Sequence, residues 1–279
     1  MKKANRVLLT LKYLFLIIAS FISVFPFFWM VISATNNARE VNAGKLTFGT
    51  HFAENLGNLF HSGLNFGPAL GNSALIAAIT TVLALLISSV AGYGFEIFRN
   101  KVRDRVFNIL LLSMMVPFCA LMIPLYRMFS AAGKAGFTGI GLNTMFSVIV
   151  PYICTAFLIF FFRQNTKSFP KDILEAARID GLNEMKIFTH MYMPVMKSTY
   201  AAGAIITFMT SWNNYLWTLV ALQDPQKRTV PLILSAMGSS YTPDYGMIMT
   251  GIVIATLPTG FLFFMMQKHF VAGMIGSVK

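Results

Sequence analysis

Charged residues are scarce in this chain. Only 11% of its 279 residues are Asp, Glu, Lys or Arg, whereas 56% are hydrophobic. An ordinary soluble domain carries roughly 25% charged residues. A soluble core this apolar would leave too little polar surface to cover it. The composition therefore indicates an integral membrane protein.

Cysteine is also rare, and the motifs of common enzymes are missing. Cys119 and Cys154 both fall inside long uncharged stretches. They form neither a disulfide framework nor a metal set, and we expect them to be buried small apolar side chains. The sequence contains no phosphate-binding loop of the G-x-x-x-x-G-K-[ST] type, no H-E-x-x-H motif and no Ser/His/Asp set in a plausible context. We expect a protein that is not an enzyme and has no catalytic, cofactor-binding or metal-binding residues.

Asp, Glu, Lys and Arg are absent from six long stretches. Each can hold the roughly 20 apolar residues that a membrane-crossing helix needs. We therefore expect an all-α polytopic protein with one transmembrane domain, residues 1–279. Its six spans would lie at about 13–34, 72–95, 106–128, 143–162, 198–220 and 245–267. The first apolar run is too long for a signal peptide, and we expect it to be retained.

Lys and Arg are unevenly distributed among the segments that connect these spans. If the N-terminus is cytoplasmic, 16 of the 22 lie on the cytoplasmic side and six lie outside. Cytoplasmic loops of membrane proteins carry this excess of positive charge. The pattern predicts a multi-pass protein of the cell membrane with both termini in the cytoplasm. The net charge of +12 then meets anionic lipid headgroups and requires no nucleic acid.

The cores of the six expected spans contain no Asp, Glu, Lys or Arg, and Arg127 lies only at the outer end of the third. Pumps and proton-coupled carriers usually need such a residue inside the membrane. If this protein performs work, its energy comes from another chain. A secondary carrier or channel that works alone is a rival hypothesis, and transport without an ATPase would support it. A membrane-embedded enzyme is disfavoured, because no acidic or histidine cluster lies near one interface.

The cytoplasmic segment 163–197 is far longer than a connection between neighbouring spans requires. Pro170 prevents an earlier helix from running through, and Asp172 and Glu175 have capping-box spacing for a short helix. Gly181 is expected to end that helix in a left-handed conformation. Ala176 and Ala177 would offer a face with almost no side chain, so that another surface can approach closely.

A second short helix is expected from Glu184 to about His190, capped by Asn183 and ended before the next span by Pro194. Its apolar side would contain Met185, Ile187, Phe188 and Met191. Two interpretations of this helix–Gly–helix unit are open. It can dock onto another protein, or it can lie as an amphipathic hairpin on the lipid headgroups.

The stretch EAARIDGLNEMKIFTHMYMP resembles the EAA loop of ATP-binding-cassette (ABC) importer permeases. That motif reads Glu-Ala-Ala, three residues, Gly, nine residues and Ile-x-Leu-Pro. Met191 and Met193 replace its Ile and Leu, and the other positions match: Glu175, Ala176, Ala177, Gly181 and Pro194. AGYGFEIFRNK at 91–101, WNNYLW at 212–217 and GSVK at 276–279 are similar to the smaller permease of maltose-type carbohydrate importers. The permeases for di- and oligosaccharides such as lactose look most similar.

The resemblance implies a type I ABC importer permease fold and a set of partners. A second, unlike permease forms a heterodimer with the chain, and two ATP-binding subunits bind on the cytoplasmic side. An extracellular or periplasmic binding protein delivers the sugar. ATP is bound by the partner subunits, and this chain holds no cofactor. Glycerol phosphate is an alternative cargo, although a phosphate would favour Arg or Lys in the pathway.

The resemblance also implies roles for particular residues. Those that couple to the ATPase are Glu175, Ala176, Ala177, Asp180, Gly181 and Pro194. The C-terminal tail, 268–279, would reach the ATPase interface through Gly276, Ser277, Val278 and Lys279.

Polar and aromatic residues lie toward the outer end of the fifth span, at Trp212, Asn213, Asn214 and Tyr215. They form either an interfacial belt with interhelical hydrogen bonds or a set of sugar contacts in the substrate pathway. Structural hydrogen bonds are the default expectation for the other polar groups in the spans, Asn72, Asn143 and Tyr152.

Proline and glycine predict local helix geometry. Pro117 and Pro124 are seven residues apart, which places them on one face of the third span, where they would kink it. Close approach of neighbouring helices is expected at the small residues Ala91, Gly92, Gly94, Gly251 and Gly260.

Overall fold

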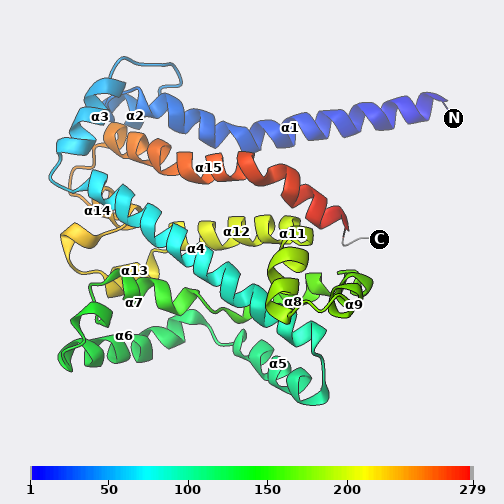
Figure 1. Ribbon diagram of the computed structural model, residues 1–279. Coiled ribbons are helices and arrows are strands. Elements are labelled where there is room, and N and C mark those ends of the chain that lie inside the picture. The colour runs from blue at the N-terminus through cyan, green and yellow to red at the C-terminus, as the bar shows by residue number, and fades with distance from the viewer. Residues whose placement is uncertain (1, 277–279) are drawn as a thin grey trace. The chain divides into compact units, whose positions relative to one another are not determined.

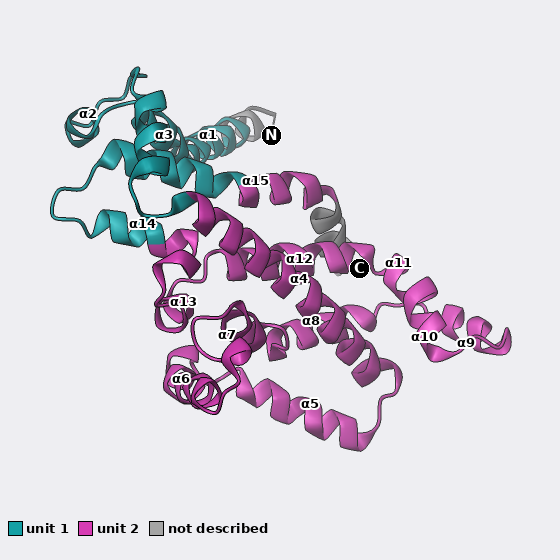
Figure 2. Cartoon of the chain, turned by 60° about the vertical axis from the view of Figure 1, so that its left-hand side comes forward, with its two compact units in different colours: residues 1–66, 233–257 teal, residues 67–232, 258–279 magenta. Residues whose placement is uncertain are grey.

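The computed structural model describes residues 2–276 and the side chains of residues 8–268. Over these residues the chain is helical and contains no β-strand, which confirms the all-α prediction. The helices form two compact units (Figure 2). The first comprises residues 1–66 and 233–257, and the second comprises residues 67–232 and 258–279.

The first unit contains α1 (Lys2–Ala34), α2 (Ala38–Asn42), α3 (Phe52–His61) and the first part of α15 (Tyr245–Gly276) (Figure 1). The unit is tied together at the end of α1. The buried amide of Asn55 donates to the carbonyls of Ala34 and Asn36, both at 2.9 Å. A helix end leaves such carbonyls without an intrahelical partner. Gly246 allows α15 to approach, since a Cβ there would lie 2.4 Å from the Asn36 carbonyl oxygen.

Helix α1 exposes nearly all of its apolar surface. Only 6% of its most apolar window is buried within the chain, and Phe15, Phe21 and Ile17 are 65–70% exposed. Exposed apolar patches of this extent on a soluble protein would be an aggregation hazard. A hydrocarbon environment removes that difficulty, as expected for a membrane-spanning helix.

The second unit contains most of the remaining helices. They are α4 (Phe66–Ile97), α5 (Lys101–Ser113), α6 (Phe118–Lys134), α7 (Met145–Ile149), α8 (Ala156–Thr166), α9 (Lys171–Ile179), α10 (Glu184–Lys186), α11 (Met193–Val195), α12 (Lys197–Trp212) and α13 (Leu216–Ala221). Short 3-10 turns lie at η1 (Thr138–Ile140), η2 (Val150–Tyr152) and η4 (Pro225–Lys227), and η3 (Ile187–Tyr192) is a π-helix. The boundary between the two units falls within helix α14 (Val230–Gly238), after Leu232.

Four helical stretches among the described residues are long and apolar enough to cross a membrane: Leu8–Ala34, Phe66–Ile97, Thr138–Thr166 and Tyr245–Lys268. The pair α5 and α6 adds a fifth if it forms one broken span. The expected span 198–220 is divided between α12 and α13. The structure therefore agrees with a multi-pass protein, and the count of six spans stays a prediction.

The third expected span is broken rather than kinked. Helix α5 ends at Ser113, α6 begins at Phe118, and the two are bent by 97°. Pro117 has no N–H to donate and disfavours helical geometry in the residue before it. It therefore precedes α6, whereas Pro124 lies inside it. The prediction that both prolines lie on one face of one helix was wrong.

Other boundaries also differ from the expected ones. Helix α4 begins at Phe66 instead of Asn72, because Pro68 lies in the first turn, where its missing N–H costs nothing. Helix α15 continues through most of the expected tail, to Gly276. Cys119 and Cys154 are free but exposed, so the prediction of buried cysteines was wrong.

Close approach occurs at two of the glycines named above. A Cβ at Gly92 would lie 2.6 Å from Cβ of Phe162, so α4 and α8 meet there. A Cβ at Gly251 would similarly lie 2.9 Å from Cδ2 of Leu234. A Cβ at Gly94 or Gly260 would meet nothing within 4 Å in the described part of the chain, so these two bring no helices of this chain together.

Two asparagines fix the connection between α13 and α14. Asn143, at φ 60°, accepts hydrogen bonds from the backbone of Gln223 and Asp224 through Oδ1. The amide of Asn72 donates to the carbonyls of Gln226 and Arg228 at 3.0 and 3.1 Å. Both side chains are structural, as expected, but they bind a loop instead of a neighbouring helix.

Candidate functional site

The first candidate site is the 163–197 loop, whose helix α9 begins at Lys171. Pro170 is the N-cap and supplies no side-chain hydrogen bond. Asp172 therefore lies in the first turn, and the predicted capping box does not form. Its carboxylate still lies near the N-terminus of α9, where the positive end of the helix dipole stabilises a negative charge.

Gly181 ends α9 as the sequence predicted. It has φ 78°, and its N–H donates to the carbonyl of Arg178 at 3.1 Å. The N–H of Leu182 reaches back to the carbonyl of Ala177 at 3.0 Å. These two bonds form a Schellman motif, in which glycine takes the left-handed position at little cost. The turn between α9 and α10 is therefore a defined structure.

One face of the loop packs into a core cluster. Leu174 and Ala177 of α9 meet Ile187, Phe188 and Tyr192 of η3. The cluster is completed by Tyr93, Phe169 and Met196. The rings of Tyr93 and Tyr192 lie 4.9 Å apart in an edge-to-face arrangement, a favourable geometry for aromatic pairs. Tyr93 belongs to α4, so the cluster holds the loop rigidly against the end of that helix.

The hydroxyl of Tyr192 adds a buried hydrogen bond, 2.6 Å from Oγ1 of Thr166. The Thr166 hydroxyl donates to the carbonyl of Phe162, so Tyr192 is the donor to Thr166. Burial raises the pKa of Tyr192, which keeps its hydroxyl protonated for this role. The π-helix is therefore tied to the end of α8 as well as to α4.

The opposite face of α9 is exposed. It contains Glu175, Ala176, Asp180 and Ile179, of which Ile179 is 86% exposed. Ala177 is buried, so the two alanines do not share one open face. Consecutive helical residues point about 100° apart. Ala176 alone provides the small exposed position that we expected from the pair.

The second half of the loop also departs from the simple helix expected there. Asn183 caps α10 as predicted, by accepting from the N–H of Lys186. Ile187 and Phe188 are buried and Met191 is partly buried, but Met185 is 68% exposed. Pro194 lies inside α11, and the helical path changes at Met196. Proline is tolerated there because it lies in the first turn of α11.

Glu184 connects the two halves of the loop to α4. Its Oε1 accepts from Arg178 Nε at 2.8 Å, and its Oε2 accepts from the Tyr93 hydroxyl at 3.0 Å. Hydrogen bonds as well as packing therefore join α9 to α4.

A buried cation lies at the start of this loop, on α8. Arg163 is 5% exposed, and its guanidinium pairs with Glu96 at 3.2 Å and with Asp104 at 2.5 Å. It also lies 4.0 Å from the ring centroid of Phe107. These contacts join α8 to α4 and α5, directly beside the close approach at Gly92.

The predicted C-terminal contact is beyond what the structure describes. Gly276 is the last residue of α15, and Ser277, Val278 and Lys279 lie outside the described residues.

The aromatic stretch at 212–217 breaks the helix between α12 and α13. Trp217 is fully buried, and its indole N–H donates to the carbonyl of Ser147 at 2.8 Å. Trp212 is 3% exposed and stacks on Phe208. Asn213 is exposed and donates to the carbonyl of Met209, whereas Asn214 and Tyr215 are partly buried. The two tryptophans are core residues, which favours the structural interpretation for them.

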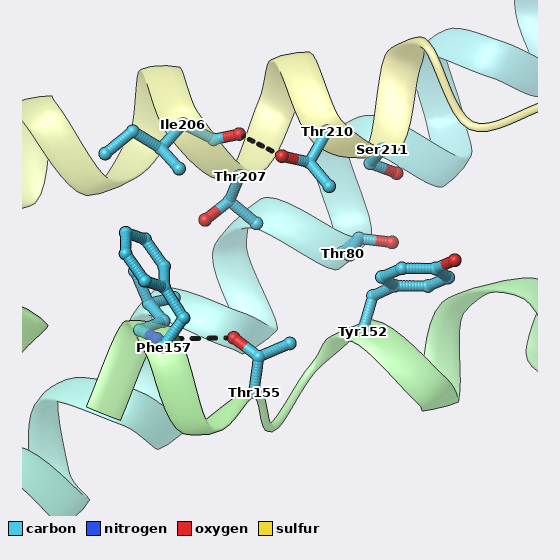
Figure 3. Close-up of a pocket in the computed structure, with 9 residues that line it drawn as sticks. Thr80, Tyr152, Thr155, Phe157, Ile206, Thr207, Thr210 and Ser211 are labelled. Atoms are coloured by element: carbon cyan, nitrogen blue, oxygen red, sulfur yellow. Dashed lines mark hydrogen bonds between the residues drawn. The ribbon is translucent and has the colours of Figure 1, made fainter. Parts of the chain in front are cut away.

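The second candidate site is a cavity of about 200 Å³ inside the second unit (Figure 3). It is lined by Thr80, Tyr152, Thr155, Phe157, Leu158, Ile206, Thr207, Thr210 and Ser211. Thr207, Thr210 and Ser211 have the i, i+3, i+4 spacing that places residues on one side of a helix. This site was not predicted from the sequence, although that hydroxyl spacing within the fifth span was a visible signal.

The sequence matches the family model for the inner membrane component of binding-protein-dependent transport systems over residues 84–276. It is 48% identical over 268 residues to the lactose transport system permease protein LacG of Rhizobium radiobacter, covering 96% of this chain and 95% of that protein. It is 29% identical to the sn-glycerol-3-phosphate transport system permease protein UgpE of Yersinia enterocolitica, over 96% of each chain.

A solved structure supports the fold. One chain of a bacterial ABC transporter involved in the import of the acidic polysaccharide alginate matches with a TM-score of 0.83. The match covers 96% of this chain and 98% of that chain, at 21% sequence identity. This likeness shows a shared permease fold.

Proposed function

Because the chain belongs to the family of inner membrane components of binding-protein-dependent transport systems, we propose that it forms half of the pathway through which an ATP-driven importer carries a di- or oligosaccharide. The other half is a second, unlike permease. Two ATP-binding subunits bind below, and ATP remains on them. A sugar-binding protein delivers the cargo from outside.

The exposed face of α9 is the proposed docking surface for an ATP-binding subunit. Its opposite face is fixed by the cluster around Tyr93 and Tyr192, and its end is fixed by the Schellman motif at Gly181. A rigid projection can transmit a displacement, whereas a loosely held loop would absorb it. The six Lys and Arg residues of the 163–197 loop favour a cytoplasmic position, and with six spans this position supports cytoplasmic termini at both ends of the chain.

A neutral sugar fits the cargo better than a phosphate. The 200 Å³ cavity is lined by hydroxyl and apolar groups and contains no Lys or Arg. A phosphate site would be expected to supply such cations. Sequence identity is also higher to the lactose permease, at 48%, than to the glycerol phosphate permease, at 29%. Glycerol phosphate therefore remains the second candidate.

Affinity purification of the tagged chain in mild detergent tests the assembly. We expect a second permease and an ATPase to be recovered with the wild-type chain. Ala176→Arg should lose the ATPase, because it places a long charged side chain on the exposed face of α9 without disturbing the buried cluster. Ala135→Arg is the matched control, since Ala135 is exposed near the end of α6, outside the 163–197 loop. Recovery of the chain alone in every case would favour a carrier or channel.

Gly181→Leu tests the same surface through the backbone. No atom lies within 4 Å of the added Cβ, so the substitution causes no clash inside the chain. Its cost comes from the positive φ, about 1–2 kcal/mol for a residue other than glycine, and from a bulky side chain at the docking surface. We expect the variant to reach the membrane but to lose sugar uptake. Normal uptake by Gly181→Leu would refute the docking role.

A further inference from the structure

The cavity between α4, α8 and α12 contains an unsatisfied polar group. Thr80 is 1% exposed, and its Oγ1 has no hydrogen-bond partner within the described part of the chain. Leaving a buried hydroxyl unpaired costs roughly 1–3 kcal/mol. Figure 3 shows Thr80 and Tyr152 toward one end of the cavity, Phe157 toward the other, and Thr207 pointing from α12 into the space between them. The residue lines the cavity and can offer its hydroxyl to a ligand there.

Other lining hydroxyls are already positioned by the backbone. The Thr155 hydroxyl accepts from the N–H of Leu158 at the start of α8. The Thr210 hydroxyl donates to the carbonyl of Ile206 at 2.8 Å, which leaves its oxygen free to accept another bond. These interactions fix both side chains before any ligand arrives. They preorganise acceptor oxygens on two sides of the cavity.

The chemistry of the lining matches one class of ligand. A sugar ring presents hydroxyls around its edge and C–H groups on its faces. The cavity supplies neutral hydroxyls beside the apolar surfaces of Phe157, Leu158 and Ile206. Its volume of about 200 Å³ is below the roughly 300–1,000 Å³ of pockets that enclose a drug-sized ligand. The cavity is therefore too small to enclose a longer saccharide, and it has room for one of its rings.

We propose that this cavity is a subsite of the present chain for a single sugar ring, with Thr80 and Thr207 as its hydrogen-bonding residues. This inference rests on the proposed function and assigns part of the pathway to residues outside the 212–217 stretch. Because the lining carries no ionisable side chain other than Tyr152, the subsite would discriminate against charged saccharides.

Thr→Val substitutions test the subsite because they remove the hydroxyl and keep the shape. Thr80→Val should leave the unliganded importer equally or more heat-stable, since it removes an unpaired buried hydroxyl. A purely structural role for that hydroxyl would lower the melting temperature instead. Thr199→Val is the control, because Thr199 is a buried threonine on α12, like Thr207, but does not line the cavity.

The readout is the melting temperature of the purified importer with and without millimolar lactose, in the absence of binding protein. Lactose should raise the melting temperature of the wild type and of Thr199→Val. Thr80→Val and Thr207→Val should need about 2- to 10-fold more lactose for the same shift, the loss expected from one neutral hydrogen bond. Galactose alone should also produce a shift, because one ring fills the site.

Two results would overturn the subsite. One is that lactose raises the melting temperature equally in the wild type and in all three variants. The other is that lactose shifts the melting temperature of none of them, although the importer accumulates lactose when ATP is supplied. Either would mean that water or lipid fills the cavity, while the proposed import function would stand. Absence of ATP-driven uptake of any sugar tested would refute the proposed function itself and the subsite with it.

Discussion

Replacing Arg163 by methionine should destabilise the protein strongly. Arg163 is 5% exposed, and the side chain of its partner Glu96 is 8% exposed. The substitution removes the guanidinium but keeps an apolar chain against Phe107, so it leaves Glu96 as an uncompensated buried charge. Breaking a buried pair in this way costs about 3–5 kcal/mol.

The magnitude can be measured as a shift in melting temperature of the purified importer. With an unfolding entropy of about 2.1 cal/mol/K per residue, 279 residues give roughly 0.6 kcal/mol/K. A loss of 3–5 kcal/mol then lowers the melting temperature by roughly 5–9 °C. Arg99→Met is the matched control, because the Arg99 side chain is 58% exposed and its pair with Asp104 should contribute only about 0–1 kcal/mol.

A double variant separates two effects of Arg163→Met: the loss of the attraction between Arg163 and Glu96, and the cost of leaving Glu96 charged without a partner. In Arg163→Met combined with Glu96→Gln, the remaining amide is neutral, and most of the lost stability should return. Equal small shifts for Arg163→Met and Arg99→Met would refute the reasoning. They would mean that the Arg163 side chain is solvated instead of buried in contacts with α4 and α5.

Two further substitutions test how α4 is held. Gly92→Ala should force α4 and α8 apart, because the new Cβ would lie 2.6 Å from Cβ of Phe162, whereas Gly94→Ala meets nothing within 4 Å and should assemble normally. The yield of folded protein in size-exclusion chromatography compares them, and equal yields would contradict the close approach. Tyr93→Phe removes the hydrogen bond to Glu184 and should cost about 0.5–1.5 kcal/mol. Faster proteolysis of the 163–197 loop would reveal the loosening, and an unchanged cleavage rate would argue against it.

Features set by one residue or by composition were predictable from the sequence. The apolar runs indicated membrane helices, and Gly181 predicted the left-handed end of α9 that the structure contains. Asn183 likewise caps α10 as expected. Each depends on local backbone chemistry, which a single sequence displays directly.

Features that depend on three-dimensional packing were not predictable in the same way. The burial of Ala177 beside an exposed Ala176 follows from which face of α9 meets Tyr93, a residue 84 positions away in the chain. The break at Pro117 was expected to be a kink, and its size of 97° depends on how α5 packs on α8 and α6 packs on α13. The cavity combines Thr80, Tyr152 and Thr207 from three separate segments. No single stretch reveals that combination.

Transport by the reconstituted importer tests the central claim most directly. The tagged chain is purified with its partners, placed in sealed vesicles, and supplied with ATP on the cytoplasmic face and with loaded sugar-binding protein on the other. We expect labelled lactose or a related saccharide to accumulate only when ATP is present. Accumulation that is independent of ATP and of the ATPase subunit would contradict it.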